Sequence, residues 1–198
     1  MNYNREKYLE AVRLELEPNI VNHSLALEAC MGEIFDFLES DGKLTENEPP
    51  REDWVLAGLI HDIDYAGDFK PDHPKRTKEA LAKYNLDIPE SVDNIVKAHG
   101  PAVSGVNPVS KAQWALFCAD SLTGLIMAVA MIRSSKKIAD VETSSVLKRF
   151  LKEPKFAAGT SRKEVAMCAD ENGLNIPLEK FIGICLSAMR KISADIGM

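Results

Sequence analysis

Apolar residues recur at helical spacing along almost the whole chain, and no stretch alternates between apolar and polar residues with a period of two. A period near 3.6 residues gives a helix one buried face, whereas a half-buried strand needs a period of two. In the segment 21–40, for example, Leu27, Cys30, Ile34 and Leu38 continue a single apolar face. The pattern therefore predicts an all-α protein.

Turn-forming residues such as Asp41-Gly42, Pro49-Pro50 and Gly100-Pro101 separate the periodic segments. Ser161, followed by Glu164, matches the capping-box pattern of a helix start. The periodic segments between these turn-forming residues predict nine helices, over Arg5–Glu15, Val21–Ser40, Arg51–His61, Pro74–Tyr84, Pro89–Ala98, Ser110–Arg133, Val141–Leu151, Ser161–Asn172 and Pro177–Ile196.

The chain has 198 residues, of which 45% are hydrophobic and 27% are charged, as in ordinary soluble globular proteins. This length suits one domain with a full core. No repeat, low-complexity tract or linker divides the sequence. We therefore expect residues 1–198 to form a single compact bundle of about eight or nine helices.

The net charge of −6 argues against a general surface for binding nucleic-acid polymers. The four cysteines form no CxxC pair, which excludes a zinc ribbon or redox motif and predicts reduced core thiols at Cys30, Cys118, Cys168 and Cys185. Residues 1–7 lack the apolar stretch of a signal peptide, and the longest apolar run, Leu122–Ile132, is too short to span a membrane. We expect a cytoplasmic protein with no membrane partner; a homo-oligomer is possible.

All four histidines lie at the ends of expected helices or on their inward faces. His61 and Asp62 are adjacent and end the apolar segment Trp54–Ile60. A buried ionisable pair at such a place is costly unless a charge compensates it, and a cation would do so. The alternative is a histidine at a helix C-terminus, close to the helix dipole, followed by a turn-forming aspartate.

Asp120 lies in the apolar run Ala115–Asp120 and shares a helix face with Thr123 and Gly124. Because the surrounding residues are apolar, we expect Asp120 to be buried, and buried carboxylates are seldom unpaired. It either binds a cation or caps a neighbouring helix. Gly124, one turn further, permits a close approach of substrate or backbone.

His23 lies on the inward face of its helix, towards the same core as Asp120. A histidine satisfied by hydrogen bonds in the core is the alternative interpretation. His73 and His99 border helix ends and, taken singly, are also consistent with surface histidines. Taken together, four imidazoles and two carboxylates are the ligand types of a catalytic transition-metal site.

The order of His23, His61-Asp62 and Asp120, all on expected helices, resembles the HD superfamily of metal-dependent phosphohydrolases. The most specific parts of this resemblance are the strings Gly58–Tyr65 and Ala119–Ile126.

Two further features extend the resemblance. His73 and His99 resemble the additional ligands of the superfamily members that have binuclear centres. The segment Phe156–Arg162 is similar to small bacterial predicted hydrolases of the superfamily whose substrate is not established. Gly100-Pro101-Ala102 replaces the signature of the cyclic-dinucleotide phosphodiesterases, so we do not expect hydrolysis of cyclic-di-GMP.

The resemblance implies an HD-domain-like bundle, with a metal-site core at about 20–130 and a helical C-terminal extension at 140–198. It implies one metal ion held by His23, His61, Asp62 and Asp120, with Asp62 bridging to a second ion held by His73 and His99. Asp64 then orients a ligand histidine or a metal-bound water, or caps the following turn, and we count it with His61 and Asp62 as catalytic.

These features predict a metal-dependent phosphohydrolase that cleaves a phosphate ester of a small molecule, such as a nucleotide, with a metal-activated water. Imidazole-rich ligation favours one or two ions of Mn, Fe, Co, Ni or Zn over Mg. The phosphorylated substrate would meet Gly124 and a basic group at the end of the Asp120 helix, made of Arg133, Lys136 and Lys137. Cations at a helix C-terminus are also explained by the helix dipole.

Two other functions use the same residues. In related proteins six such ligands hold two irons and catalyse the oxygen-dependent cleavage of a diol or phosphonate. The third possibility is a metal-stabilised helical domain that binds a ligand without catalysis.

Overall fold

The computed structural model describes residues 3–198, in which every regular element is a helix and no strand occurs. The all-α prediction is therefore confirmed, and each of the nine expected helices has a counterpart. The α-helices are α1 (Arg5–Glu15), α2 (Pro18–Ser40), α3 (Arg51–Ile60), α4 (Thr77–Ala82), α5 (Glu90–Lys97), α6 (Pro101–Ser104), α7 (Lys111–Met131), α8 (Thr143–Lys152), α9 (Arg162–Ala166) and α10 (Leu178–Lys191). Three 3-10 helices join them: η1 (Gly67–Asp72), η2 (Ile138–Asp140) and η3 (Met167–Ala169).

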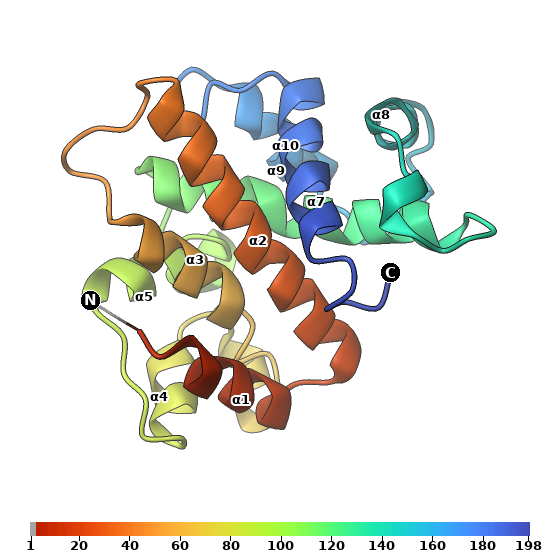
Figure 1. The fold of residues 1–198 in the computed structure, drawn as a ribbon. Helices are drawn as coiled ribbons and strands as arrows, with labels where there is room; N and C mark the ends of the chain where they lie inside the picture. The colour runs from red at the N-terminus through yellow and green to blue at the C-terminus, as the bar shows by residue number, and fades with distance from the viewer. Residues whose placement is uncertain (1–2) are drawn as a thin grey trace.

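Helix α2 crosses the molecule diagonally and packs against α3 on one side and against α7 and α10 on the other (Figure 1). It begins at Pro18, before the expected start at Val21, because proline fits the first turn of a helix without losing a hydrogen bond. The predicted apolar face is buried: Leu27, Cys30, Ile34 and Leu38 are all 0% exposed. Side chains on this helix are thus fixed by packing on several sides.

Helices α2 and α3 approach each other closely at Gly58. A Cβ atom at position 58 would lie 2.9 Å from the backbone of Leu27 and Glu28 on α2. Such a distance leaves no room for a side chain, so only glycine permits this spacing between the two helices. The close approach occurs one turn before the end of α3, where His61 and Asp62 follow.

Helix α7 begins with a capping box at Ser110, which is not among the features expected from the sequence. The Ser110 hydroxyl accepts from the Gln113 amide, and the Gln113 side chain accepts from the Ser110 amide. The capping box expected at Ser161 is wrong, since this residue makes no side-chain cap. The start of α9 is held instead by the guanidinium of Arg162, which binds backbone carbonyls of the preceding segment.

By length and composition, α7 is apolar enough to cross a membrane. However, 61% of its most apolar 18-residue window is buried among the other helices. This burial is typical of a core helix.

Some expected boundaries shift where prolines and glycines make tertiary contacts. The helix expected over 74–84 begins only at Thr77, because Pro74 packs against Gly100: a Cβ at position 100 would lie 2.7 Å from the Pro74 ring. The helix expected over 161–172 divides into α9 and η3, and α10 ends at Lys191 rather than at Ile196.

The C-terminal helices share one hydrophobic core with the N-terminal helices. This core extends from Tyr8 to Ile196, and α10 packs directly against α2. The four cysteines are free and buried in it, as expected. Burial raises the pKa of the Cys168 thiol to about 12, so this group is protonated and unreactive near neutral pH.

Candidate metal centre

The four histidines and two aspartates come together at one place, from elements far apart in the sequence. Five of these six residues, all except Asp120, form two groups, and within each group the ligand atoms lie within 4.8 Å of one another. We call His23, His61 and Asp62 the first triad, and Asp62, His73 and His99 the second triad. Either group can hold a metal ion, and Asp62 belongs to both.

The first triad is carried by helices. His23 projects from α2, and His61 caps the C-terminus of α3. Their Nε2 atoms lie 3.2 Å apart, and Asp62 Oδ2 lies 3.3 Å from His61 Nε2. Asp120, on α7, flanks this triad, with its Oδ1 2.9 Å from His23 Nε2 and 3.8 Å from His61 Nε2.

The second triad is carried by connecting segments. His73 follows η1, and His99 follows α5. Their Nε2 atoms lie 3.0 Å apart, and Asp62 Oδ1 lies 3.4 Å from His73 Nε2. The two oxygens of Asp62 therefore face different triads, which is the arrangement of a bridging carboxylate.

Each histidine of the first triad presents Nε2 to the centre because its Nδ1 is engaged elsewhere. His61 Nδ1–H donates to the carbonyl of Gly58, at 3.0 Å. His23 Nδ1 lies 2.9 Å from the Thr123 hydroxyl, which itself donates to the Asp120 carbonyl. The hydroxyl oxygen must therefore accept from His23, and this fixes a lone pair on Nε2 of the neutral ring.

The histidines of the second triad are oriented in the same way, through hydrogen bonds of their Nδ1 atoms. His99 Nδ1–H donates to the Val96 carbonyl at 2.5 Å, and His73 Nδ1–H donates to Asp64 Oδ1 at 2.7 Å. The other oxygen of Asp64 accepts from the backbone amide of Arg76, at 2.9 Å. Hydrogen bonds of this kind orient the histidines of metal sites and raise the basicity of the ligand nitrogen.

The spacing of the nitrogens fits a shared ion. Two nitrogens that bind one ion at about 2.1 Å, in tetrahedral or octahedral geometry, lie roughly 3.0–3.4 Å apart. The two Nε2–Nε2 distances, 3.2 and 3.0 Å, fall in this range. Two lone pairs that face each other at this distance repel unless a proton or a cation lies between them.

The carboxylates of Asp62 and Asp120 also favour a positive charge at the centre of the site. Burial alone would lower the pKa of His61, but the neighbouring Asp62 and Asp120 carboxylates raise it to about 9. Burial would raise the pKa of Asp62, but the histidines around it, His61 first, hold it well below its usual range. Burial and His61 together lower the pKa of His99 to about 4. The carboxylates are thus ionised, and a proton on His61 or a metal ion balances them.

A cavity of about 590 Å³ opens onto these residues. Five of the six predicted ligands line it; His61, which is 0% exposed, reaches the centre from beneath. The remaining wall is made of Tyr65, Gly100, Val103, Ser121, Gly124, Ala157, Gly159 and Thr160. No lysine or arginine is among the residues that line this cavity in the described part of the chain.

No family model, curated protein or solved structure matches the chain. The assignment of a function therefore depends on the geometry and chemistry of the site itself.

The structure corrects the expected burial of Asp120 and gives the position of Asp64. Asp120 is not fully buried: 30% of its side chain is exposed, because it faces the cavity rather than the apolar core. Asp64, expected among the catalytic residues, is fully buried behind His73 and does not line the cavity. Three roles were expected for Asp64, and its hydrogen bond with His73 supports the first of them, the orientation of a ligand histidine.

The basic group expected at the substrate lies elsewhere. Arg133, Lys136 and Lys137 do not line the cavity, since they follow the C-terminus of α7, about two turns beyond Gly124. The guanidinium of Arg133 donates to the Ser145 hydroxyl instead. Gly124 does line the cavity, with open space above its Cα.

Sequence reasoning missed several residues of the cavity wall. Tyr65 and Ser121 lie within the strings Gly58–Tyr65 and Ala119–Ile126, so their position in these motifs was a usable signal. Val103 lies on α6, a single turn that no periodicity could indicate. Ala157, Gly159 and Thr160 belong to the Phe156–Arg162 segment, whose sequence does not indicate that it lies beside the ligands.

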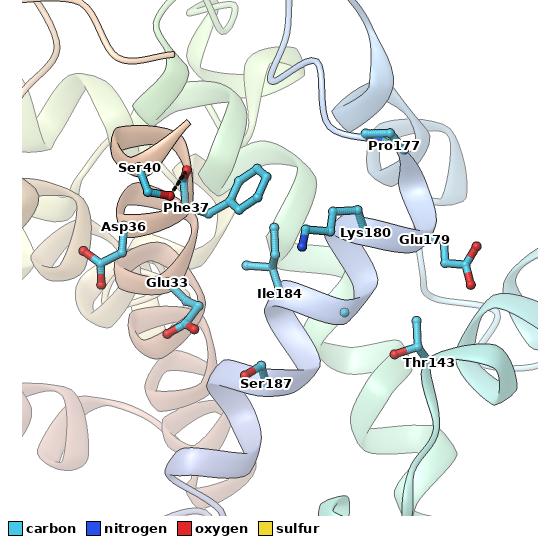
Figure 2. Close-up of a pocket in the computed structure, with 11 residues that line it drawn as sticks. Glu33, Asp36, Phe37, Ser40, Thr143, Pro177, Glu179, Lys180, Ile184 and Ser187 are labelled. Carbon is cyan, nitrogen blue, oxygen red and sulfur yellow. Dashed lines mark hydrogen bonds between the residues drawn. The ribbon is translucent and has the colours of Figure 1, made fainter. Parts of the chain in front are cut away.

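A larger hollow of about 890 Å³ lies between α2 and α10 and does not share this chemistry. Figure 2 shows its carboxylates on opposite sides, Glu33 and Asp36 on α2 and Glu179 on α10. Glu33 is paired with Lys191 and Asp36 with Arg51, and no histidine lines this hollow. The smaller cavity is therefore the candidate functional site.

Proposed function

We propose that this protein is a metal-dependent hydrolase of phosphate esters with a binuclear centre. The observation that carries the proposal is the convergence of four Nε2 atoms and the two oxygens of Asp62 into two triads that share this residue, with Asp120 Oδ1 beside the first triad. Two ions held by these residues would stabilise the charge that develops on a phosphoryl group and would lower the pKa of bound water. Imidazole-rich ligation favours Mn, Fe, Co, Ni or Zn.

The residues of the chain have distinct roles in this proposal. His23, His61, His73 and His99 hold the ions, with Asp62 between them and Asp120 beside the first. Asp64 and Thr123 fix the orientation of two of these histidines from behind. Tyr65 and Val103 give the cavity an apolar rim for the part of the substrate that does not react. The volume of about 590 Å³ admits a small molecule such as a nucleotide.

The test is elemental analysis of protein purified without chelator or affinity-tag metal, combined with turnover of p-nitrophenyl phosphate and bis-p-nitrophenyl phosphate in Mn²⁺, Co²⁺ and Ni²⁺. Asp62→Ala should lose both metal and turnover while the fold is kept. Asp68→Ala is the matched control, because Asp68 is an exposed aspartate six residues away that belongs to neither triad.

The other outcomes are informative. Two irons per chain without phosphatase activity would favour the di-iron oxygenase. Unfolding of Asp62→Ala without any turnover in the wild type would favour a structural metal site. Protein without any metal would overturn the proposal.

A further inference from the structure

The segment 156–160 forms one wall of the metal cavity. Ala157, Gly159 and Thr160 line it together with residues of both triads. Because no lysine or arginine of the described chain lines the cavity, a phosphate group that enters it meets no cationic side chain there. Phosphate oxygens that are not bound to metal must find other donors, and buried oxyanions without donors are costly.

Arg162 holds this loop from behind. Its Nε donates to the Phe150 carbonyl at 3.1 Å, and its Nη2 donates to the carbonyls of Glu153 and Phe156 at 3.1 and 2.6 Å. No carboxylate within residues 3–198 forms an ion pair with this guanidinium. A planar guanidinium has five N–H donors in a fixed geometry, so it can donate to several carbonyls at once.

The orientation of one carbonyl determines the orientation of the next amide. In a planar trans peptide the C=O and the following N–H point in opposite directions. Because the Phe156 carbonyl points to Arg162, the Ala157 amide points away from it. Ala157 itself has a left-handed φ of +46°, which turns the chain sharply at this place.

Three successive amides of the loop are free. The amides of Ala157, Ala158 and Gly159 donate to no acceptor in the described structure, whereas the Thr160 amide donates to the Ala157 carbonyl. Free amides in a turn that includes a left-handed residue form concave sites for anions. Ala157 and Gly159 line the cavity that also contains the two triads, and Ala158 lies between them in the loop.

We propose that the 156–160 loop is an oxyanion-binding subsite, in which backbone amides and the Thr160 hydroxyl bind phosphate oxygens that the metals leave free. Arg162 is its positioning residue: it holds the carbonyls away from the cavity and does not touch the phosphate. The inference rests on the proposed function and extends it. The ligand class is a phosphate monoester or its product, inorganic phosphate.

The first experiment compares Arg162→Gln with Lys163→Gln. Both remove one positive charge at adjacent positions, but Lys163 is exposed and makes no hydrogen bond or ion pair in the described residues. Arg162→Gln should raise the KM for p-nitrophenyl phosphate and the Kd of inorganic phosphate by about tenfold or more, because the loop loses charge-assisted hydrogen bonds. Metal content should stay unchanged, and Lys163→Gln should stay within about twofold of the wild type.

Equal weakening in both variants would show a general charge effect and overturn the proposal, as would unchanged phosphate binding in Arg162→Gln. A second measurement on the wild type needs no variant and so does not depend on folding of the mutant. Inorganic phosphate is titrated into ¹⁵N-labelled, Zn²⁺-loaded protein. The amide signals of Ala157, Ala158 and Gly159 should shift with the same Kd that calorimetry gives for phosphate.

Phosphate binding without a shift of these three signals would overturn the subsite and leave the hydrolase proposal intact. Conversely, wild type that binds metal and phosphate at the loop but does not hydrolyse any ester would overturn the hydrolase and leave the subsite.

Discussion

The two triads share Asp62 but are built from different kinds of structure. His23 projects from the 23-residue α2, and Asp120 beside it comes from the 21-residue α7; both helices are packed in the core. His73 and His99 instead follow a 3-10 helix and an eight-residue helix and depend on local hydrogen bonds and on the Pro74–Gly100 contact. Segments held mainly by local contacts open at lower cost than packed helices. We therefore expect the first triad to bind its ion more tightly than the second.

The largest effect should come from the residue that the triads share. Asp62→Asn keeps the shape of the side chain but removes the negative charge that faces both groups. We expect metal content to fall from about two ions per chain to less than one, and turnover to fall to background. Metal analysis after gel filtration measures this. If the variant still holds two ions, Asp62 does not bridge them.

Substitution of a single histidine should affect the ion of one triad and not the ion of the other. His73→Ala should lose the second-triad ion and keep the first-triad ion. His23→Ala should weaken the binding of the first-triad ion. A chelator titration of each variant should therefore show one class of ion. In the wild type, the second-triad ion should leave at the lower chelator concentration. Release of both ions together in every protein would show that the triads act as one site.

A smaller effect is expected from Asp64, which contacts His73 but lies outside the cavity. Asp64→Asn should weaken the second-triad ion by about 10–100-fold and leave the first unchanged, because such supporting hydrogen bonds tune metal affinity to this extent. The measurement is competitive Zn²⁺ titration with a chromophoric chelator. Asp68→Asn, at an exposed aspartate of the same region, should show no change.

The smallest effect concerns the hydroxyl behind His23. Thr123→Val removes the acceptor of His23 Nδ1 without a change in volume and should weaken the first-triad ion by about tenfold. Thr123→Ser retains the hydroxyl and should restore the affinity. If the serine variant is as weak as the valine variant, packing of the methyl group matters rather than the hydrogen bond.

The long helices were predictable because each is long enough for its apolar period to stand out. Val21–Ser40 and Ser110–Arg133 differ from α2 and α7 by three residues or fewer at each end. The short elements were not predictable in detail, because their limits depend on contacts such as Pro74 against Gly100. A single turn such as α6 contains too few residues to show any period.

The candidate ligands could be found from sequence because histidine is rare in this chain and every copy lies at the end of an expected helix or on its inward face. The sequence could not show the hydrogen bonds that orient these ligands. The acceptors for His61 and His99 are backbone carbonyls of Gly58 and Val96, which carry no side-chain signal. The misplacement of Arg133 has a related cause: charge in a sequence does not show which way a helix end points once the chain is folded.

The contact between Gly58 and α2 has a consequence for the centre as a whole. Gly58 supplies the carbonyl that orients His61, and its missing side chain sets how near α3 comes to the helix that carries His23. The distance between two ligand nitrogens is thus a property of how two helices pack, and it changes when a single methyl group is added away from the ligands. A protein built in this way can change the size of ion that it prefers while every ligand stays the same.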